Sequence, residues 1–464
     1  MNILVVIPSD GYIRNYLTSS ALSGLENKHN VSFLVSDSVK NLSSLDGKNF
    51  DLYDHDNKNH KKHFYIFDLL MWRYRKKSST FKFRLSRTQG LNFRFSEDTP
   101  WAIKVLKTFW RLIRFFFLKI RNYTLGSSYL FYPYFSFLKS NLNENSKIRQ
   151  IIEKNSPDII IFPCSAYDPD GNDIISISKK FKIKTFFLVD NWDNLSSKSI
   201  FWIKPDYLGV WGKQSLEHAI EIQGFSEEQI ILLGTPRFND YFKYRDQKLS
   251  SPYDFKYVLF VGTALAFDEP EALKFYEKIL EKNQDIFPGL KLVYRPHPWR
   301  QKSMFSSSRN IELNKFKHII LDKQIEHAYK SNNNDDSFQP QLEYYPALIN
   351  NAEFVTGGLT SMLIESVIFR KMFLGLIHDD RKHFTSMHRV FKGYKHFQGI
   401  ESMDAILLCD NLENLEVSFI NAWKQKKSLN NTAVDNQRQY YYYDDNQDYS
   451  IRLLDACNKV LLNE

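Results

Sequence analysis

Short apolar runs alternate with segments of helical periodicity along most of the chain. Residues 2–7 form a β-branched apolar run that breaks at residues 8–11, before a segment of helical character. Residues 31–35 form a second run of the same kind. Such short runs between turn signals are typical of buried parallel strands. The start of the chain therefore predicts an α/β domain, in which helices join parallel strands.

The same rhythm returns after residue 147 and continues almost to the end of the chain. Strands are predicted at 158–162, 185–190, 207–212, 230–234, 257–262, 291–295, 352–357 and 371–377. Helices are predicted at 148–155, 172–181, 214–222, 269–283, 344–351, 361–370, 412–426 and 450–462. A polar, tyrosine-rich stretch at 241–253 is the expected linker. We therefore expect two α/β domains, residues 1–245 and 255–440, and a terminal helix within 445–464 that packs back on the first domain.

Composition supports this organisation and indicates where the protein works. The 464 residues exceed what one hydrophobic core usually supports, and a hydrophobic content of 43% allows two cores. The three cysteines are odd in number and far apart, which fits neither a disulfide framework nor a zinc site. The first apolar run is short and lacks a basic flank, unlike a signal peptide. We expect a cytoplasmic protein.

Positive charge is concentrated in one segment. Residues 61–121 hold 16 lysines and arginines against three acidic residues, whereas the whole chain carries a net charge of +9. Aromatic residues are interleaved with these charges, and the best predicted helix, 101–123, contains six basic residues. Each charge costs roughly 2.5–3.5 kcal/mol at the centre of a bilayer, so this helix cannot span one.

A basic and aromatic segment of this kind suits the surface of a membrane. Lysine and arginine are attracted to anionic lipid headgroups, and aromatic rings can enter the interface. We therefore expect residues 61–121, within an insertion at about 50–145, to lie on the inner face of the plasma membrane. The alternative is that the aromatic side chains cover the protein's own core and the charges are solvated.

A first candidate binding motif follows the predicted strand at 291–295. Arg295 and His297 alternate with two prolines, which fix the backbone and direct the imidazole outward. His297 can donate to a phosphate oxygen or a base carbonyl, and Arg295 offers a fork of donors for phosphate. The alternative is a proline turn in which the histidine is incidental.

A second motif, at 356–361, lies between a strand and a helix. Gly358 lets the backbone approach a ligand, Thr360 and Ser361 add hydroxyl donors, and Glu365 could accept from a ribose hydroxyl. The alternative is a capped βα turn. Residues 262–264 repeat this chemistry in weaker form. The predicted donor-binding residues are Gly262, Thr263, Arg295, His297, Gly358, Thr360, Ser361 and Glu365.

These two motifs, in this order, resemble a known group of enzymes. RPHP at 295–298 followed by GGLTSMLIE at 357–365 is similar to the donor half of CDP-glycerol glycerophosphotransferases, capsule transferases and bacterial sialyltransferases of the GT-B fold. The stretch at 190–198, with VWGKQS and GTPRFNDYF after it, is similar to related surface-carbohydrate proteins. The resemblance covers residues 155 to 380.

The resemblance implies both a fold and an activity. The fold would be two Rossmann-like domains whose parallel sheets face a central cleft, with the nucleotide on the C-terminal domain near His297, Thr360 and Ser361. The activity would be transfer of a sugar or polyol phosphate from a CMP-, CDP-, UDP- or GDP-linked donor to a glycan or lipid-linked acceptor. An acidic motif that holds the base in some of these families has its nearest match at 168–171, where a proline interrupts it.

Inverting transfer needs a group that takes the proton of the acceptor hydroxyl, and positive charge near the leaving phosphate. Acidic residues at the strand ends of the first domain are the candidates for the base: Asp10, Asp168, Asp170, Asp190 and Asp193. We expect Asp193, with Asp10 second, to be catalytic; the alternative for Asp193 is an Asx-turn or helix cap. Arg14, Lys198 and Arg237 are the candidates for binding acceptor or donor phosphates.

No metal and no cofactor are expected. Residues 168–170 spell Asp-x-Asp, a pattern that can ligate a divalent ion, but residues 54–56 spell it too in a polar stretch with no strand before it. We therefore interpret both strings as chance.

Two other functions remain open at this stage. A UDP-sugar 2-epimerase resembles GT-B enzymes in fold and also has a Gly-Gly turn before its second nucleotide-binding helix. A nonenzymatic, membrane-associated scaffold is the other alternative, although polar groups at three separate strand ends argue against it. Nucleic-acid binding is not expected, because the sequence has no RNP, zinc-finger or helix-turn-helix signal.

Overall fold

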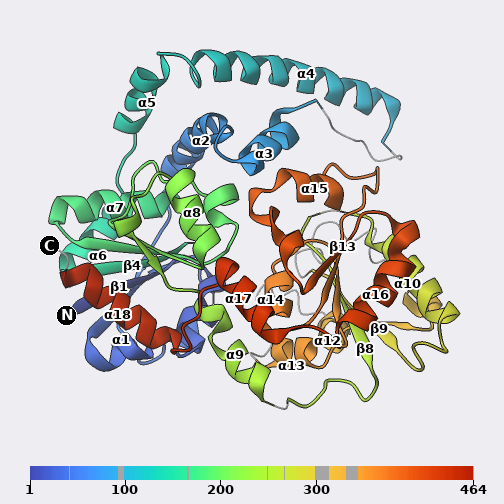
Figure 1. The fold of residues 1–464 in the computed structure, drawn as a ribbon. Helices are drawn as coiled ribbons and strands as arrows, with labels where there is room; N and C mark the ends of the chain where they lie inside the picture. The colour runs from blue at the N-terminus through green and yellow to red at the C-terminus, as the bar shows by residue number, and fades with distance from the viewer. Residues whose placement is uncertain are drawn as a thin grey trace. The chain divides into compact units, whose positions relative to one another are not determined.

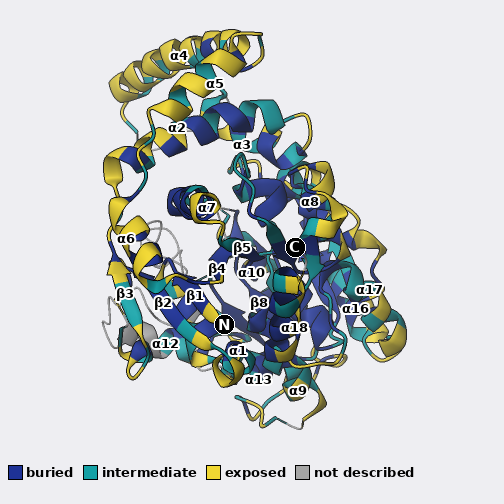
Figure 2. Cartoon of the chain, turned by 90° about the vertical axis from the view of Figure 1, so that its left-hand side faces the viewer, coloured by how far each residue is buried: buried dark blue, intermediate teal, exposed yellow. Residues whose placement is uncertain are grey.

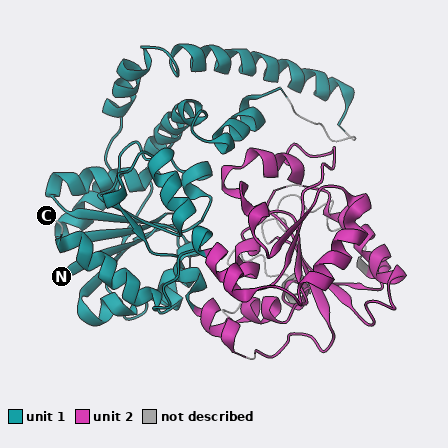
Figure 3. Cartoon of the chain, in the orientation of Figure 1, with its two compact units in different colours: residues 1–239, 439–464 teal, residues 240–438 magenta. Residues whose placement is uncertain are grey.

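The chain folds into two compact α/β units. The computed structural model describes residues 1–40, 42–91, 99–164, 167–247, 249–265, 267–297, 313–330 and 343–462. Unit 1 comprises residues 1–239 and 439–464, and unit 2 comprises residues 240–438 (Figure 1, Figure 3). Each unit contains one sheet in which every described strand pair is parallel.

The sheet of unit 1 has seven strands in the order β3-β2-β1-β4-β5-β6-β7. Its strands are β1 (Asn2–Ile7), β2 (Asn30–Ser36), β3 (Phe50–Tyr53), β4 (Ile159–Cys164), β5 (Lys184–Val189), β6 (Tyr207–Val210) and β7 (Ile230–Leu232). The strand order reverses between β1 and β4, which is where open α/β sheets bind their ligands, beyond the carboxyl ends of the strands.

The end of the chain completes the core of unit 1. Helix α18 (Tyr449–Leu462) buries Leu453 and Cys457 in the same apolar cluster as Ile3 and Val5 of β1. The remaining helices of this unit are α1 (Ser23–Lys28), α2 (Asn57–Tyr74), α3 (Ser79–Gln89), α4 (Trp101–Thr124), α5 (Phe131–Ser140), α6 (Ser146–Asn155), α7 (Pro169–Phe181) and α8 (Lys213–Glu221).

The insertion divides into a packed part and an exposed helix. Helices α2, α3 and α5 bury Ile66, Phe81 and Phe131 in a second apolar cluster. The buried residues of α4, in contrast, are Arg121 and Asn122, so this helix gives no apolar side chain to a core. Figure 2 shows the central strands β1, β4 and β5 as largely buried and α4 as exposed over most of its length. Among the described residues, no helix is both long enough and apolar enough to cross a membrane.

Unit 2 repeats the strand order of unit 1, with β10-β9-β8-β11-β12-β13. The strands are β8 (Tyr257–Val261), β9 (Lys291–Arg295), β10 (Ile319–Leu321), β11 (Val355–Gly357), β12 (Phe373–Leu376) and β13 (Ile406–Cys409). The helices are α9 (Asn239–Asp246), which begins at the last residue of unit 1, α10 (Glu269–Lys282), α12 (Lys323–Lys330), α13 (Tyr344–Asn350), α14 (Met362–Ile368), α15 (Met387–Gly393), α16 (Leu415–Gln425) and α17 (Asn431–Tyr441). The strand order reverses between β8 and β11.

Candidate active site

Three loops of unit 2 meet where its strand order reverses. They follow β8, β9 and β11, which are neighbours in the sheet. Gly262 donates its backbone N–H to the carbonyl of Arg295 at 2.8 Å, and a Cβ atom on Gly262 would lie 2.8 Å from the backbone nitrogen of His297. The loop after β8 therefore needs a glycine to lie against the loop that carries His297.

The loop after β11 packs against the loop after β8. A Cβ atom on Gly358 would lie 2.6 Å from Cγ2 of Thr263, so these two loops are also in close contact. Thr360 and Ser361 follow and are half-buried, and the Ser361 side chain makes no capping hydrogen bond to the described residues of α14. Ser361 is nevertheless the N-cap residue of α14, as the capping alternative expects. The structure brings Gly262, Thr263, His297 and Gly358 together. Pro298 lies outside the described residues.

Gly357 has a backbone conformation that only glycine adopts readily. Its φ is 144°, and a Cβ atom there would lie 2.2 Å from the carbonyl oxygen of Val261 on β8. We predict that Gly357→Ala lowers stability by about 2 kcal/mol, because it adds a steric clash to backbone strain. Gly289→Ala is the control: its φ is also positive, 69°, but a Cβ atom meets nothing within 4 Å. Equal urea midpoints for the two variants would contradict the prediction.

Two of the predicted donor-binding side chains are turned into the protein. Arg295 is 4% exposed, and its Nη1 lies 2.6 Å from Oδ1 of Asp322. Glu365 is fully buried and accepts a hydrogen bond from the Tyr241 hydroxyl at 3.0 Å. A buried charge is stable only when it is paired and hydrogen-bonded, which explains the contact of Arg295 with Asp322. In this structure Arg295 is held by Asp322 and Glu365 by Tyr241, and their predicted ligand contacts stay predictions.

Sequence reasoning missed two polar residues at this edge of unit 2. Glu269 is buried and accepts hydrogen bonds from the Thr263 backbone N–H at 3.1 Å and from the Tyr294 hydroxyl at 2.6 Å, which joins the loops after β8 and β9. His378 follows β12, is 6% exposed, and neither ring nitrogen has a hydrogen-bond partner within the described chain. Burial lowers the pKa of His378, which keeps its imidazole neutral. A histidine directly after an apolar strand was the available signal.

In unit 1 the polar side chains gather around Asp190, at the carboxyl end of β5. Asp190 is 8% exposed, and its removal from water raises its pKa to about 6. Arg237, Arg14 and Lys198 act against this shift through their positive charges, and the Asn15 amide donates to Asp190 Oδ1 at 3.4 Å. The three cations predicted to bind phosphates are therefore brought together around one carboxylate.

Two π-helical segments position two of these cations. One, Ile13–Thr18, follows β1 and carries Arg14 and Asn15; the other, Asn194–Lys198, follows β5 and carries Lys198. The sequence predicted one continuous helix where the first of these segments lies. Single π-turns are rare and often occur at functional sites, because the wider turn changes the direction in which side chains project.

The residues predicted to be catalytic are occupied in local contacts. Asp193 accepts a hydrogen bond from the Ser197 hydroxyl at 2.9 Å and pairs with Lys198 at 3.0 Å. These contacts stabilise the segment 193–198, in which Asp193 itself lies. Asp10 accepts from the backbone N–H of Lys40 at 2.9 Å. Asp168 caps α7 by accepting from the backbone N–H of Asp170 at 3.0 Å. Asp190, in contrast, is influenced by the positive charges of Arg237, Arg14 and Lys198.

Comparison with solved structures supports the observed architecture, whereas comparison of sequences identifies no relative. Neither the models of protein families nor the curated protein sequences give a match to this chain. Among solved structures, a Listeria monocytogenes protein assigned as a UDP-N-acetylglucosamine 2-epimerase has a TM-score of 0.54 at 13% identity, covering 100% of this chain and 97% of that one. The UDP-GlcNAc 2-epimerase from Neisseria meningitidis, bound to UDP-GlcNAc, has a TM-score of 0.52 at 10% identity, covering 100% of both chains.

A third solved structure gives the same result. The UDP-GlcNAc 2-epimerase from Methanocaldococcus jannaschii has a TM-score of 0.50 at 12% identity, covering 98% of this chain and 100% of that one. Identities this low carry information about the fold and not about the reaction. Together with the two parallel sheets, these similarities confirm the predicted fold class: the chain has two Rossmann-like domains of the GT-B type.

Proposed function

We propose that this protein is an enzyme that takes a sugar or polyol phosphate from a nucleotide-activated donor and transfers it to a bacterial surface glycan. The observation that carries the proposal is the meeting of three loops at the point where the strand order of unit 2 reverses. Two of these loops approach through Gly262 and Gly358, and open sheets bind nucleotides at such points. The sequence resemblance to transferases of surface carbohydrates supports the same assignment.

In this proposal the donor binds to unit 2. The half-buried Thr360, Ser361 and His297 lie in these loops and supply donors for a phosphate. The neutral imidazole of His378 is a further donor or acceptor for the nucleotide, since its ring nitrogens have no partner among the described residues. The UDP-GlcNAc bound to the Neisseria meningitidis enzyme supports a nucleotide-sugar as the first ligand to test.

Unit 1 supplies the acid–base chemistry. A base must be deprotonated at neutral pH and must gain a proton readily, and a carboxylate whose pKa is about 6 meets both needs. We assign this role to Asp190 in preference to Asp193, because the Asp193 carboxylate is already bound to Ser197 and Lys198 of its own segment. Arg14 and Arg237 would stabilise an anionic acceptor group or the leaving phosphate. Transfer by these residues requires no divalent cation.

The exposed helix α4 supports a lipid-linked acceptor. Its outward strip consists of seven apolar residues at helical spacing, between 45% and 70% exposed: Leu106, Phe109, Trp110, Ile113, Phe116, Phe117 and Ile120. Such a strip on a helix with basic flanks fits the interface of an anionic membrane. The alternative that the aromatic side chains of residues 61–121 cover the protein's own core holds for part of the segment, since Phe81 is buried and Trp72 and Tyr74 pack against the same cluster, but the aromatic side chains of the α4 strip are exposed. A membrane-bound acceptor would be within reach of a protein held at that surface.

A UDP-sugar 2-epimerase is the second candidate function, because three solved structures with this fold have that activity or are assigned it. The two activities differ in what they require. An epimerase converts a UDP-sugar to its C2 epimer with no acceptor, whereas a transferase releases nucleotide at a rate that depends on the acceptor. Incubation with UDP-GlcNAc alone, followed by chromatography, separates them: accumulation of the epimer would overturn the transferase assignment. Because an epimerase acts on a dissolved substrate, the exposed α4 favours transfer.

The donor site is tested by substitution. We predict that His297→Ala and Ser361→Ala each weaken donor binding or turnover at least about tenfold, which corresponds to about 1.4 kcal/mol. His318→Ala is the matched control, because His318 precedes β10 at the amino end of the same sheet and should have no effect. Calorimetric titration with CMP, CDP, UDP and GDP and their sugar conjugates measures the change. Unchanged affinity and turnover in both folded variants would remove the donor site from these loops.

A further inference from the structure

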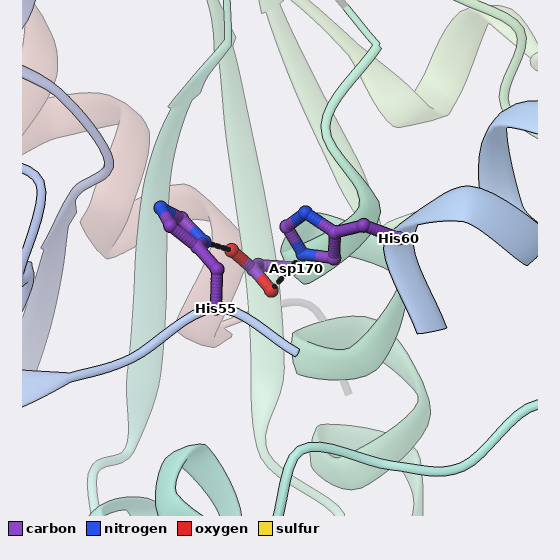
Figure 4. A group of neighbouring side chains, drawn as sticks. All are labelled: His55, His60 and Asp170. Carbon is purple, nitrogen blue, oxygen red and sulfur yellow. Dashed lines mark hydrogen bonds and ion pairs between the residues drawn. The ribbon is translucent and has the colours of Figure 1, made fainter. Parts of the chain in front are cut away.

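Two histidines from the start of the insertion face one buried carboxylate of the sheet domain. His55 follows β3, His60 lies in the first turn of α2, and Asp170 lies in the first turn of α7 (Figure 4). Nδ1 of His55 lies 2.5 Å from Oδ2 of Asp170, and Nε2 of His60 lies 2.8 Å from Oδ1. The Asp170 side chain is 1% exposed, whereas those of His55 and His60 are 25% and 17% exposed.

The three groups have the chemistry and spacing of a metal site. One nitrogen of each imidazole and a carboxylate oxygen lie within 4.8 Å of one another. Zinc bonds of about 2.0–2.2 Å in a tetrahedron place ligand atoms about 3.3 Å apart, so the shifts needed to admit an ion are small. Histidine nitrogen and carboxylate oxygen are preferred ligands of zinc and of related first-row divalent ions.

The residues around His55, His60 and Asp170 also fit a metal site. The second ring nitrogen of His55, Nε2, lies 2.8 Å from the Ser36 hydroxyl, and metal-bound histidines almost always have such an outer partner. The carboxylate is held in place by its backbone, because Pro169 opens α7 and Asp168 accepts from the Asp170 backbone N–H. The backbone of Asp170 is therefore fixed at the start of α7 independently of an ion.

We propose that His55 Nδ1, His60 Nε2 and the Asp170 carboxylate bind one divalent transition-metal ion of the zinc class. The ion takes the lone pairs of the two nitrogens, so each neutral imidazole carries its proton on the other nitrogen. In His55 that proton is then donated to the Ser36 hydroxyl. Water completes the coordination.

The proposed metal site takes one ligand from each of the two Asp-x-Asp strings that we interpreted from the sequence as chance. Residues 54–56 and 168–170 lie side by side, although the ligands are His55 and Asp170 and not a pair of aspartates. The proposal departs from the expectation of a chain without metal. The ion would tie the beginning of the insertion to the carboxyl end of β4 through α7, which is a structural role. It does not depend on the proposed transfer activity.

Cobalt is a suitable probe, because Co²⁺ replaces zinc at such sites and its visible absorption reports coordination by protein. The full-length protein, treated with a chelator and then freed of it, should bind one equivalent of Co²⁺, which Zn²⁺ should displace. His60→Gln and Asp170→Asn should each weaken Co²⁺ binding at least tenfold. His383→Gln is the matched control: His383 also faces an aspartate, with Nδ1 2.8 Å from Asp380 Oδ2, but it belongs to no three-ligand group among the described residues.

A second measurement needs no variant and so does not depend on whether the variants fold. In the wild-type protein, Zn²⁺ should protect His55 and His60 from modification by diethyl pyrocarbonate, read by mass spectrometry, and should leave His383 as reactive as before. Absence of a saturable one-to-one Co²⁺ complex, or equal modification of His55 and His60 with and without Zn²⁺, would show that the cluster is only a hydrogen-bonded clamp. Catalytic turnover enters neither measurement, so this outcome is separate from any failure of the proposed function.

Discussion

Replacement of Asp190 by asparagine should lower turnover by about 10²–10⁴-fold and leave the affinity for the nucleotide donor unchanged. The reason is that the side chain keeps its size and its contact with Asn15 but can no longer take a proton. Donor affinity belongs to unit 2 in the proposed function, so calorimetric titration of the variant with the donor should reproduce the wild-type value. Steady-state kinetics and this titration together test the assignment.

The pH dependence of turnover offers an independent check on the same residue. A base works in its deprotonated form, and burial raises the pKa of Asp190 to about 6. Turnover should therefore fall as the pH decreases through about 6 and stay level above it until another group titrates. The variant that lacks the carboxylate should lose this acid limb from whatever activity remains.

Asp193→Asn is the control for position and charge. Asp193 lies three residues further along the chain and is paired with Lys198, so its loss should disturb one loop and cost far less turnover than the loss of Asp190. If Asp193→Asn were inactive and Asp190→Asn fully active, the original choice from the sequence would be right and the assignment to Asp190 wrong.

The sequence predicted the parallel strands well because each is an uninterrupted apolar run. Three strands were missed, β3, β10 and β13, and all of them lie at the edge of a sheet. Edge strands are often short, and their patterns are weak because one side has no neighbouring strand to bury it. The π-helical segment at Ile13–Thr18 could not be predicted either, since its residues have the same periodicity as an ordinary helix.

The sequence predicted which kinds of residues lie at the candidate site, but not which residues contact one another there. Glycines and hydroxyl residues after strands marked the loops of unit 2 correctly as loops, but the contacts of Arg295 with Asp322 and of Glu365 with Tyr241 were not foreseen. Those partners are separated in sequence, and local pattern cannot pair distant residues. The contact between His55 and Asp170 spans 115 residues and was invisible for the same reason. The burial of Asp190 and the three cations around it are likewise properties of the folded chain.

Wild-type protein should sediment with vesicles that contain anionic lipid, and removal of three positive charges from α4 should weaken that binding about a hundredfold. Each lysine or arginine near an anionic surface contributes about 1 kcal/mol, so Arg111, Arg114 and Lys119 together contribute about 3 kcal/mol. The apolar strip of α4 adds to this by entering the interface. Phe117→Glu, which places a charge where a phenylalanine is 70% exposed, should reduce binding to anionic and neutral vesicles alike.

The control variant removes the same number of positive charges, three, from other helices of unit 1. Lys147, Lys179 and Lys213 are exposed residues of α6, α7 and α8, and their replacement by alanine should leave vesicle binding nearly unchanged. Equal partitioning of the wild type and the α4 triple variant would contradict the membrane assignment. In that case, a concentration-dependent dimer detected by analytical ultracentrifugation and abolished by Phe117→Glu would show that the apolar strip binds a second copy of the chain. Binding to vesicles that requires both the charges and the strip would instead place the enzyme at the membrane, where a lipid-linked acceptor is found.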